Sequence, residues 1–307
     1  MWIQKLILAL SVLMVLFALT GCAGTKKSSP IMATIPGVSG HFKIGQILEL
    51  KTGTVLSFDQ FIDQISSKDL IFIGEVHDNP EHHLIQVQIL QALLACCGPL
   101  SIAMEFFEKP QQSILDRYRR GELDESEFLR EVDWGSDYHF YRPLIRMANQ
   151  HGAEVRAINA PREVVRKVAR QGLASLDEPE RNKIAKKIDL SNEAHRNYVR
   201  EAYERHPRGD LKKFDYFYEA QCVWEDTMAE NLAEYLKENE TKLIAFTGNG
   251  HIINQFGIPD RTIERIPVSM VTIMPLPLSE QVTIKKETAH YVWLTADYPS
   301  RARRPLK

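Results

Sequence analysis

The sequence has no excess of positive charge and little cysteine. Its 38 lysines and arginines stand against 40 aspartates and glutamates, which gives a formal net charge of -2. Because such a chain has no basic field that attracts phosphate backbones, we expect no nucleic acid partner. With 4 cysteines among 307 residues, 44% of them hydrophobic, the chain is neither a disulfide scaffold nor a disordered protein. The length favours one large globular domain.

Long hydrophobic runs are also rare, and the clearest one lies close to the first residue. Lys5 precedes the apolar or small residues 6–19, which are fewer than the roughly 20 residues that span a membrane as a helix. The letters LTGC at 19–22 then resemble a bacterial lipobox, in which cleavage leaves the cysteine as a lipidated N-terminus. We expect a signal peptide at residues 1–21 and a lipid on Cys22. The alternative is an ordinary signal peptide with a coincidental cysteine.

The segment after the lipobox is rich in Gly, Ser, Thr and Pro. Residues 22–44 are therefore interpreted as the lipidated N-terminus and tether of a soluble domain at 45–300. By resemblance to sorted lipoproteins, Ala23 indicates the outer membrane, with the domain facing the periplasm.

Short apolar runs alternate with helical patterns in the rest of the chain. Residues 70–73 are apolar and end at Gly74, which is typical of a strand buried on both faces of a parallel sheet. Similar runs predict strands at 100–104, 154–158, 243–246, 268–274 and 291–294. Amphipathic segments without a strand fill residues 161–239. We predict an α/β fold with a mostly parallel central sheet flanked by helices, and a helical insertion at 161–239 before the last parallel strand.

Polar side chains follow four of these strands, and ligands bind beyond the carboxyl ends of strands in open parallel sheets. They are Glu75 and His77 after the first strand, Glu105 after the second, Asn159 after the third, and Asn249 and His251 after the fourth. Two acids and two histidines can serve as general acid and base, or as ligands of a divalent metal such as zinc. Each has a structural alternative as a helix cap, a partner of a loop carbonyl or half of a core ion pair.

Aromatic residues gather at 134–141, at 214–218 and in a helical pattern at 195–206. A porphyrin needs an apolar slot, an axial ligand such as tyrosine or histidine, and groups that bind its propionates. The candidates for haem binding are Tyr141, Tyr198, Tyr203, His195 and His206. The alternative is that these rings form core and the exposed face of an ordinary amphipathic helix.

The remaining cysteines leave two interpretations open. Cys96 and Cys97 are adjacent, and Cys222 lies far along the chain. An oxidising compartment permits one long-range disulfide. Alternatively, all three are buried thiols that pack as small apolar residues.

Several segments together resemble the family of ChaN-like haem-binding lipoproteins, which is related to the Tiki and erythromycin-esterase-like folds. They are IGEVHDNP at 73–80, AMEFF at 103–107, QCVWEDTMA at 221–229, GNGH at 248–251 and GIP at 257–259. The order and intervals of these segments carry the resemblance, which covers about residues 45–275 and agrees with the lipobox.

The resemblance implies an α/β domain that binds haem, a tyrosine ligand for the iron, and a homodimer that brings haems together. It also implies a setting of iron acquisition, with outer-membrane haem-uptake machinery as a partner. It gives no position for the tyrosine, because the matched segments contain none. In the esterase-like relatives, the positions of Glu75, His77, Glu105 and His251 are catalytic.

We expect a lipid-anchored, periplasm-facing protein that binds haem for acquisition or storage. The alternative is a hydrolase, in one version metal-dependent, that uses the Glu75, His77, Glu105 and His251 cluster. A third interpretation is a structural lipoprotein, because fold alone does not imply function.

Overall fold

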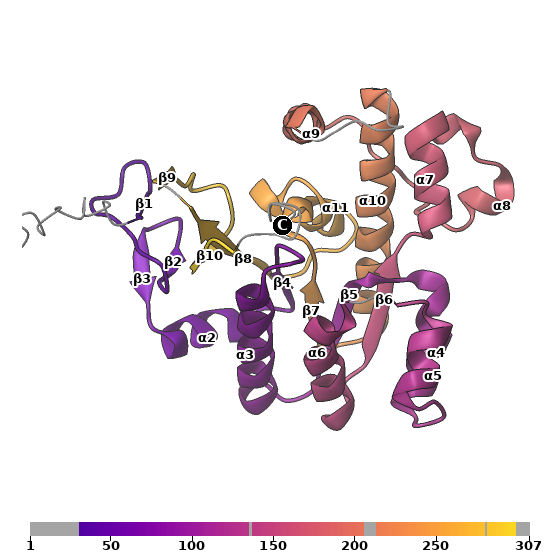
Figure 1. Cartoon of the computed structure of the whole chain (residues 1–307), viewed down its shortest axis with the longest axis horizontal. Coiled ribbons are helices and arrows are strands. Elements are labelled where there is room, and N and C mark those ends of the chain that lie inside the picture. The colour runs from indigo at the N-terminus through magenta and orange to yellow at the C-terminus, as the bar shows by residue number, and fades with distance from the viewer. Residues whose placement is uncertain (1–30, 135–136, 206–212, 280, 299–307) are drawn as a thin grey trace, which may run out of the picture. The chain divides into compact units, whose positions relative to one another are not determined.

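Parallel strands form the centre of the sheet in the computed structural model, which describes residues 31–134, 137–205, 213–279 and 281–298 (Figure 1). The order in the sheet is β3-β2-β10-β8-β4-β7-β5-β6, with β2 and β3 antiparallel at one edge and the others parallel. Their bounds are β2 (Ile47–Glu49), β3 (Thr54–Leu56), β4 (Leu70–Ile73), β5 (Leu100–Glu108), β6 (Val155–Asn159), β7 (Lys242–Phe246), β8 (Met270–Leu278) and β10 (Tyr291–Ala296). A second small sheet pairs β1 (Ala33–Thr34) with β9 (Val282–Thr283).

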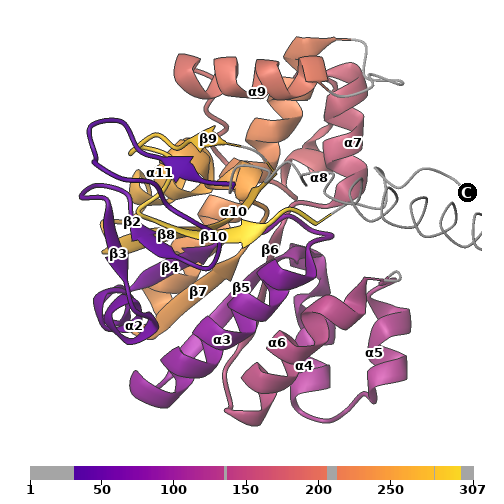
Figure 2. The same ribbon diagram turned by 60° about the vertical axis from the view of Figure 1, so that its left-hand side comes forward.

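Helices cover both faces of the large sheet (Figures 1 and 2). On one side lie α2 (Phe58–Ser66), α3 (Pro80–Cys96) and α6 (Tyr138–Gln150), and on the other α10 (Phe214–Glu238) and α11 (Ile258–Ile263). The remaining helices are α4 (Gln112–Arg119), α5 (Glu125–Glu131), α7 (Arg162–Gln171), α8 (Glu178–Arg181) and α9 (Glu193–Arg205). Short 3-10 turns are η1 (Lys109–Gln111), η2 (Leu173–Ser175), η3 (Asn249–His251) and η4 (Ile253–Gln255). The predicted α/β fold with a helix-flanked, mostly parallel sheet is confirmed.

The alternation of side chains along β4 explains why both faces are covered. Successive residues of a strand point to opposite faces. Ile71 and Ile73 pack into the cluster that contains α3, whereas Leu70 and Phe72 pack into the cluster that contains α10. All four side chains are fully buried, as expected for a strand with helices on both sides.

The turn after β4 starts α3 as the sequence indicates. Asn79 is the N-cap and accepts a hydrogen bond from the Glu81 backbone N–H over 2.9 Å. Pro80 occupies the first helical position, where its missing N–H has no cost. Because Asn79 caps the helix, the Glu75 carboxylate is available for other contacts.

The helical insertion holds α7 to α10, but it does not precede the last parallel strand. It precedes β7, which lies in the middle of the sheet between β4 and β5. Two more parallel strands, β8 and β10, follow in the chain. The prediction is wrong on this detail because strand order depends on how the connections cross the sheet, which an apolar run does not encode.

The second strand is longer than predicted, so Glu105 lies inside β5. Its regular pairing with β7 ends where Met104 opposes Phe246, and the pairing with β6 shifts register after Met104. Glu105 therefore still stands at the carboxyl edge of the sheet, beyond the end of β7.

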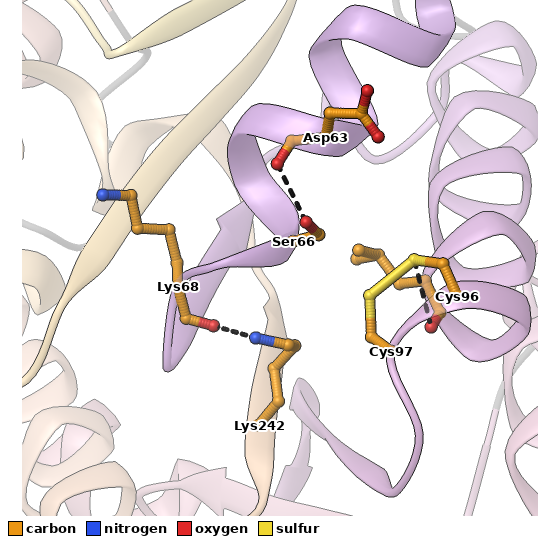
Figure 3. Close-up of a disulfide and its surroundings, with 7 residues drawn as sticks. Asp63, Ser66, Lys68, Cys96, Cys97 and Lys242 are labelled. Carbon is orange, nitrogen blue, oxygen red and sulfur yellow. Dashed lines mark hydrogen bonds between the residues drawn. A yellow bond between two sulfur atoms is a disulfide. The ribbon is translucent and has the colours of Figure 1, made fainter.

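The cysteines follow neither interpretation completely. Adjacent Cys96 and Cys97 form a disulfide at the end of α3 (Figure 3), and Cys222 is a buried free thiol in α10. The alternative of a long-range disulfide is excluded, because Cys96 and Cys97 pair with each other. Cys222 lies against Arg261, whose Nη2 donates to its sulfur over 3.3 Å. Burial raises the pKa of the Cys222 thiol to about 12.

Some sequence predictions fall on residues outside the described ranges. They are the signal peptide, the lipidated Cys22, the first part of the tether and His206. Within the described ranges, none of the helices combines the length and the apolar character that crossing a membrane requires.

Candidate functional site

Glu75 follows β4 directly, and side chains of α6 and α3 hold its carboxylate. Its carboxylate is fully buried, and Tyr141 of α6 donates a hydrogen bond to Oε1 over 2.6 Å. Gln86 of α3 donates to Oε2 over 2.8 Å. Burial and the Glu75 charge raise the pKa of Tyr141, so the phenol keeps the proton that it donates. These donors fix Glu75 in one orientation, as a buried carboxylate requires.

His77 is oriented by Glu75. Its Nδ1 lies 2.8 Å from Glu75 Oε1, and the ring is 60% exposed. The hydrogen bond that its ring donates to Glu75 raises the pKa of His77, although burial opposes this. A Cβ at Gly248 would lie 3.3 Å from His77 Nε2 and 3.7 Å from Glu105 Oε2. The glycine therefore leaves room for both groups at the end of β7.

Glu105 occupies the middle of the cluster. The Gly248 backbone N–H donates to its Oε2 over 2.7 Å, and His251 Nε2 lies 3.4 Å from its Oε1. Burial opposes ionisation, but the charge and hydrogen bond of His251 hold the pKa of Glu105 below its usual value. Glu105 is therefore a carboxylate at neutral pH.

A second glutamate and histidine pair lies on the far side of Glu105. His251 Nδ1 is 3.2 Å from Glu225 Oε1, to which Gln221 also donates over 2.7 Å. Burial opposes the charge of His251, but Glu105 and Glu225 raise its pKa to about 10. His251 is therefore charged at neutral pH.

Glu225 connects this pair to the interior. It is fully buried in α10, and its Oε2 lies 3.2 Å from His195 Nε2 and 3.6 Å from Arg261 Nε. Burial raises the pKa of a carboxyl group, but the neighbouring histidines His195 and His251 bring that of Glu225 well below its usual value. His195 is thus a buried partner of Glu225 on α9.

Two glutamate and histidine pairs consequently converge on Glu105. Each histidine turns Nδ1 toward its own glutamate, Glu75 or Glu225, and Nε2 toward the side of Glu105. The structure brings together the four residues that the sequence placed at the strand ends. A carboxylate between two imidazoles with glutamate partners can accept and donate protons at neutral pH.

The two asparagines support this edge through backbone contacts. Asn159 donates from Nδ2 to the Glu105 backbone carbonyl over 2.8 Å, and Asn249 donates to the Pro275 carbonyl over 2.8 Å. They therefore contact the backbone of β5 and β8 near this edge of the sheet.

A pocket of about 660 Å³ opens in front of Glu105, and we call it the strand-end pocket. Its walls include the rings of Phe106, Trp134 and Tyr141 as well as His77 and Glu105. Its volume lies within the usual range of small-molecule sites, about 300–1,000 Å³.

A second cavity, the α7–α10 cleft, has a volume of about 350 Å³. Its lining is mostly apolar and consists of Arg162, Val165, Arg166, Ala169, Phe217, Ala220, Gln221 and Trp224. Arg162 and Trp224 also line the strand-end pocket, so the two cavities share a wall.

The tyrosines predicted for haem binding occupy different places. Tyr141 belongs to the Glu75 cluster, whereas Tyr198 is half-buried on α9. Tyr203 is buried on α9 against the rings of Phe214 and Phe217. The structure does not bring these three tyrosines together.

Sequence reasoning did not single out Glu225, Gln221 or Tyr216 as site residues. Glu225 and Asp226 are adjacent acids in a helix whose neighbours Val223 and Met228 are fully buried. Acids at such positions signal a buried charge network, and this signal was available in the sequence. Tyr216 carries no comparable signal, because its position depends on how α7 ends.

No group of three or more His, Cys, Asp or Glu residues within the described ranges is arranged to hold a metal ion. The divalent metal stays a prediction.

Comparison with known proteins gives a family match. The model of a family described as haem-binding uptake, Tiki superfamily, ChaN matches residues 61–262. The chain is also similar to the structure of ChaN of Campylobacter jejuni with cofacially bound haem, with a TM-score of 0.65 and 19% identity over 80% of this chain and 95% of that chain.

Other similarities are weaker. An erythromycin esterase mutant in its open conformation gives a TM-score of 0.45 and 12% identity, over 75% of this chain and 76% of that chain. Protein RETICULATA-RELATED 5, chloroplastic, of Arabidopsis thaliana is 21% identical over 77% of this chain. The chain spans only 35% of the length of that plant protein.

Proposed function

Because the chain belongs to the ChaN family of haem-binding uptake proteins, we propose that it binds haem in the α7–α10 cleft. The observation that carries the location is the apolar lining of this cleft. Val165 and Ala169 of α7 face Phe217 and Trp224 of α10 across it. Flat apolar ligands bind in such slots.

Two arginines at the mouth of the cleft suit the propionates of haem. Arg166 is exposed, and Arg162 has a side chain that is 71% exposed and lies 3.6 Å from Glu108. Arg166 has no ion-pair partner among the described residues. Arginine binds carboxylates through paired hydrogen bonds, so both side chains can reach propionates at the surface.

Tyr216 is the tyrosine that we assign to the haem iron. Its ring lies against Gly172, the residue that ends α7, where a Cβ would approach Tyr216 Cε1 to 2.7 Å. Lys213 Nζ donates to its hydroxyl over 3.3 Å. This ammonium group offsets the negative charge of a phenolate, the form in which tyrosine binds ferric iron. Tyr141, by contrast, already donates to Glu75.

We expect the Tyr216→Phe variant to bind ferric haem at least about tenfold more weakly than the wild type. It should also lose the visible charge-transfer band of phenolate-ligated iron. Absorption titration of the purified soluble domain with ferric haem measures both. Tyr291→Phe is the matched control, because Tyr291 lies in β10 and donates its hydroxyl to Gln64, away from the cleft lining.

Variants of the tyrosines on α9 and α6 test whether another tyrosine binds the iron. If Tyr198→Phe or Tyr141→Phe removes the band while Tyr216→Phe keeps it, the assignment to Tyr216 is wrong and the sequence-based candidate is right. If haem does not bind saturably to the wild type, haem binding itself is refuted for this chain.

The cleft also supports a homodimer with cofacial haems. Its mouth carries exposed Arg162 and Arg166, so one face of a bound haem would stay uncovered. A second protomer with its own haem would cover that face. Sedimentation with and without haem tests this, and a haem-loaded monomer would contradict it.

For the location, we propose a lipid on Cys22 that holds the domain at the outer membrane on the periplasmic side, next to haem-uptake machinery. The LTGC motif at 19–22 supports this. Incorporation of labelled palmitate into the wild type but not into Cys22→Ser tests it, and an unlabelled, freely soluble wild type would contradict it.

A second function, hydrolysis at the strand-end pocket, is favoured by the convergence of two glutamate and histidine pairs on Glu105. In this scheme Glu105 takes a proton from water while the water oxygen attacks an ester carbonyl. Charged His251 or His77 then gives a proton to the departing alkoxide, so that acid and alcohol are the products.

For this second function, we expect Glu105→Gln to reduce the hydrolysis of p-nitrophenyl acetate by at least about 100-fold. Haem binding in the α7–α10 cleft should stay unchanged. Glu240→Gln is the control, because this exposed glutamate precedes β7 at the opposite end of the strand. Wild-type protein that hydrolyses no faster than buffer, or a Glu105→Gln variant with full activity, would refute the scheme.

A further inference from the structure

The strand-end pocket combines aromatic walls with carboxylates, which neither haem binding nor the hydrolytic scheme explains. Phe106, Trp134 and Tyr141 form one wall. Their ring centroids lie 4.0 Å apart for Phe106 and Tyr141, 5.4 Å for Trp134 and Tyr141, and 6.4 Å for Phe106 and Trp134. Three rings in contact present a continuous π surface to the pocket.

The charged groups that line the pocket are mainly acidic. Glu105, Glu108, Asp133 and Asp137 contribute four carboxyl groups, against the basic groups of Arg162 and His77. Arg162 is within 3.6 Å of Glu108 and points largely to solvent. With His77 protonated and the charge of His251 beside Glu105 included, the four carboxyl groups still outnumber the three basic groups.

Glu105 is the carboxylate of the glutamate and histidine cluster that also lines this pocket. Gly248 donates to Oε2, and the charged imidazole of His251 lies 3.4 Å from Oε1 on the protein side. The Glu105 side chain is 12% exposed and lines the pocket. A ligand with a positive group can approach the Glu105 carboxylate from the pocket side.

From these features we propose that the strand-end pocket binds a small organic cation, an ammonium or guanidinium group on an apolar stem. The cation lies over the rings of Phe106 and Trp134 and forms an ion pair with Glu105. Aromatic faces attract cations within about 6 Å of the ring centroid, and more strongly where water is excluded. The volume of about 660 Å³ admits a whole side chain of the size of arginine.

The apolar and acidic character of the pocket also separates its ligand from haem. Haem carries propionates, which four carboxyl groups repel, whereas the α7–α10 cleft offers arginines. The two cavities share Trp224 and Arg162 but differ in the charge that they accept. This inference does not depend on hydrolysis at Glu105 or on haem in the cleft.

The test compares acetyl-argininamide with acetyl-citrullinamide, its uncharged isostere, by calorimetric titration of the haem-free protein. We expect saturable binding of the arginine compound and at least about tenfold weaker binding of the citrulline compound. Equal binding of both, or no saturable binding of the arginine compound, would overturn the proposal.

Two variants connect the binding to the pocket. Glu105→Gln and Trp134→Leu should each weaken binding at least about fivefold. Glu240→Gln, at the opposite end of the sheet, should not change it. Unchanged binding in Glu105→Gln and Trp134→Leu would place the cation on other surface acids and overturn the assignment.

Asp133→Asn provides a further test if Glu105→Gln or Trp134→Leu fails to fold. Asp133 is exposed and has φ of 52°, a left-handed conformation that asparagine also adopts readily. This variant should fold normally and bind the arginine compound about threefold more weakly, with less dependence on salt. Unchanged affinity and salt dependence would count against the pocket.

Titration with a peptide tests whether the natural ligand is a protein segment or a free small molecule. A decapeptide with a central arginine, titrated in the same way, should bind at least about tenfold more tightly than acetyl-argininamide if the natural ligand is a protein segment. Equal affinities would instead assign the site to a free small molecule. Both results agree with a cation site in the pocket. If the peptide and acetyl-argininamide both bind more weakly than acetyl-citrullinamide, the pocket does not select a cation and the proposal is wrong.

Discussion

We expect the Glu225→Ala variant to lose about 3–5 kcal/mol of unfolding free energy, because it leaves buried charges without their partner. Glu225 is fully buried, and it contacts His251, His195 and Arg261 within 3.6 Å. Removing its carboxylate takes from His195 its only carboxylate partner among the described residues. It also takes one of two from His251, which keeps Glu105, and one of two from Arg261, which keeps Asp226. The cost exceeds that of an ordinary side-chain truncation for this reason.

Urea unfolding of the soluble domain at neutral pH measures this loss. Glu225→Gln removes the charge but keeps the size of the side chain and part of its hydrogen bonding. This variant should therefore lose less stability than Glu225→Ala. Glu240→Ala, an exposed glutamate, should lie within about 0.5 kcal/mol of the wild type. A Glu225→Ala variant as stable as Glu240→Ala would show that the buried network does not stabilise the fold.

The pH dependence of this contribution follows from the direction of the pKa shift. The pKa of Glu225 is lower in the folded protein than its usual value of about 4.3. The stabilisation is therefore present above the unfolded pKa and is lost only as the pH falls through the folded pKa. Neutral pH shows the full difference between the variants.

The second large effect concerns His251. We expect the difference in unfolding free energy between wild type and His251→Asn to fall by up to about 4 kcal/mol as the pH rises from 6 to 10. The folded pKa of His251 is about 10, which Glu105 and Glu225 produce against the effect of burial. Its usual value is about 6.5.

The sign follows from the raised pKa. The stabilisation by a group with a raised folded pKa is fully present below the unfolded pKa and is lost as the pH rises through the folded pKa. His251→Asn lacks this titration, so the two curves should converge near pH 10. Lysines and tyrosines titrate in both proteins and cancel in the difference.

Denaturant unfolding at several pH values gives the two curves. His151→Asn serves as the matched control, because this exposed histidine hydrogen-bonds the Met147 carbonyl instead of a carboxylate. Its difference from wild type should stay flat over the same range. A flat difference for His251→Asn as well would mean that Glu105 and Glu225 do not stabilise a charged imidazole.

Local sequence patterns predicted the sheet edge correctly. The apolar run at 70–73 and its stop at Gly74 became β4, and Glu75 and His77 follow it directly. Strand character and helix starts depend on neighbours within a few residues, so a single sequence carries them. Parallel strands share one carboxyl edge, and this geometric rule alone brings Glu75 and Glu105 to the same place.

The contacts that His251 and His195 make with Glu225 depend on the tertiary arrangement of the helices. His251 contacts Glu225 because α10 packs in the same core cluster as β7, and His195 reaches Glu225 because α9 packs on α10. No spacing in the sequence encodes these contacts, since the residues lie on separate elements. The same holds for Tyr216, whose ring lies against Gly172 only because α7 ends there.

By itself, the sequence determined an alternating α/β chain, a family resemblance and a set of acids and histidines at one sheet edge. Only the tertiary structure decided that two glutamate and histidine pairs meet at Glu105, that Cys222 stays a free thiol, and that an acidic aromatic pocket adjoins an apolar cleft. The physical reason is the distance along the chain over which each interaction acts. Periodicity and capping act within a few residues, whereas charge pairing and cavity shape arise between segments that meet only after the chain has crossed the sheet.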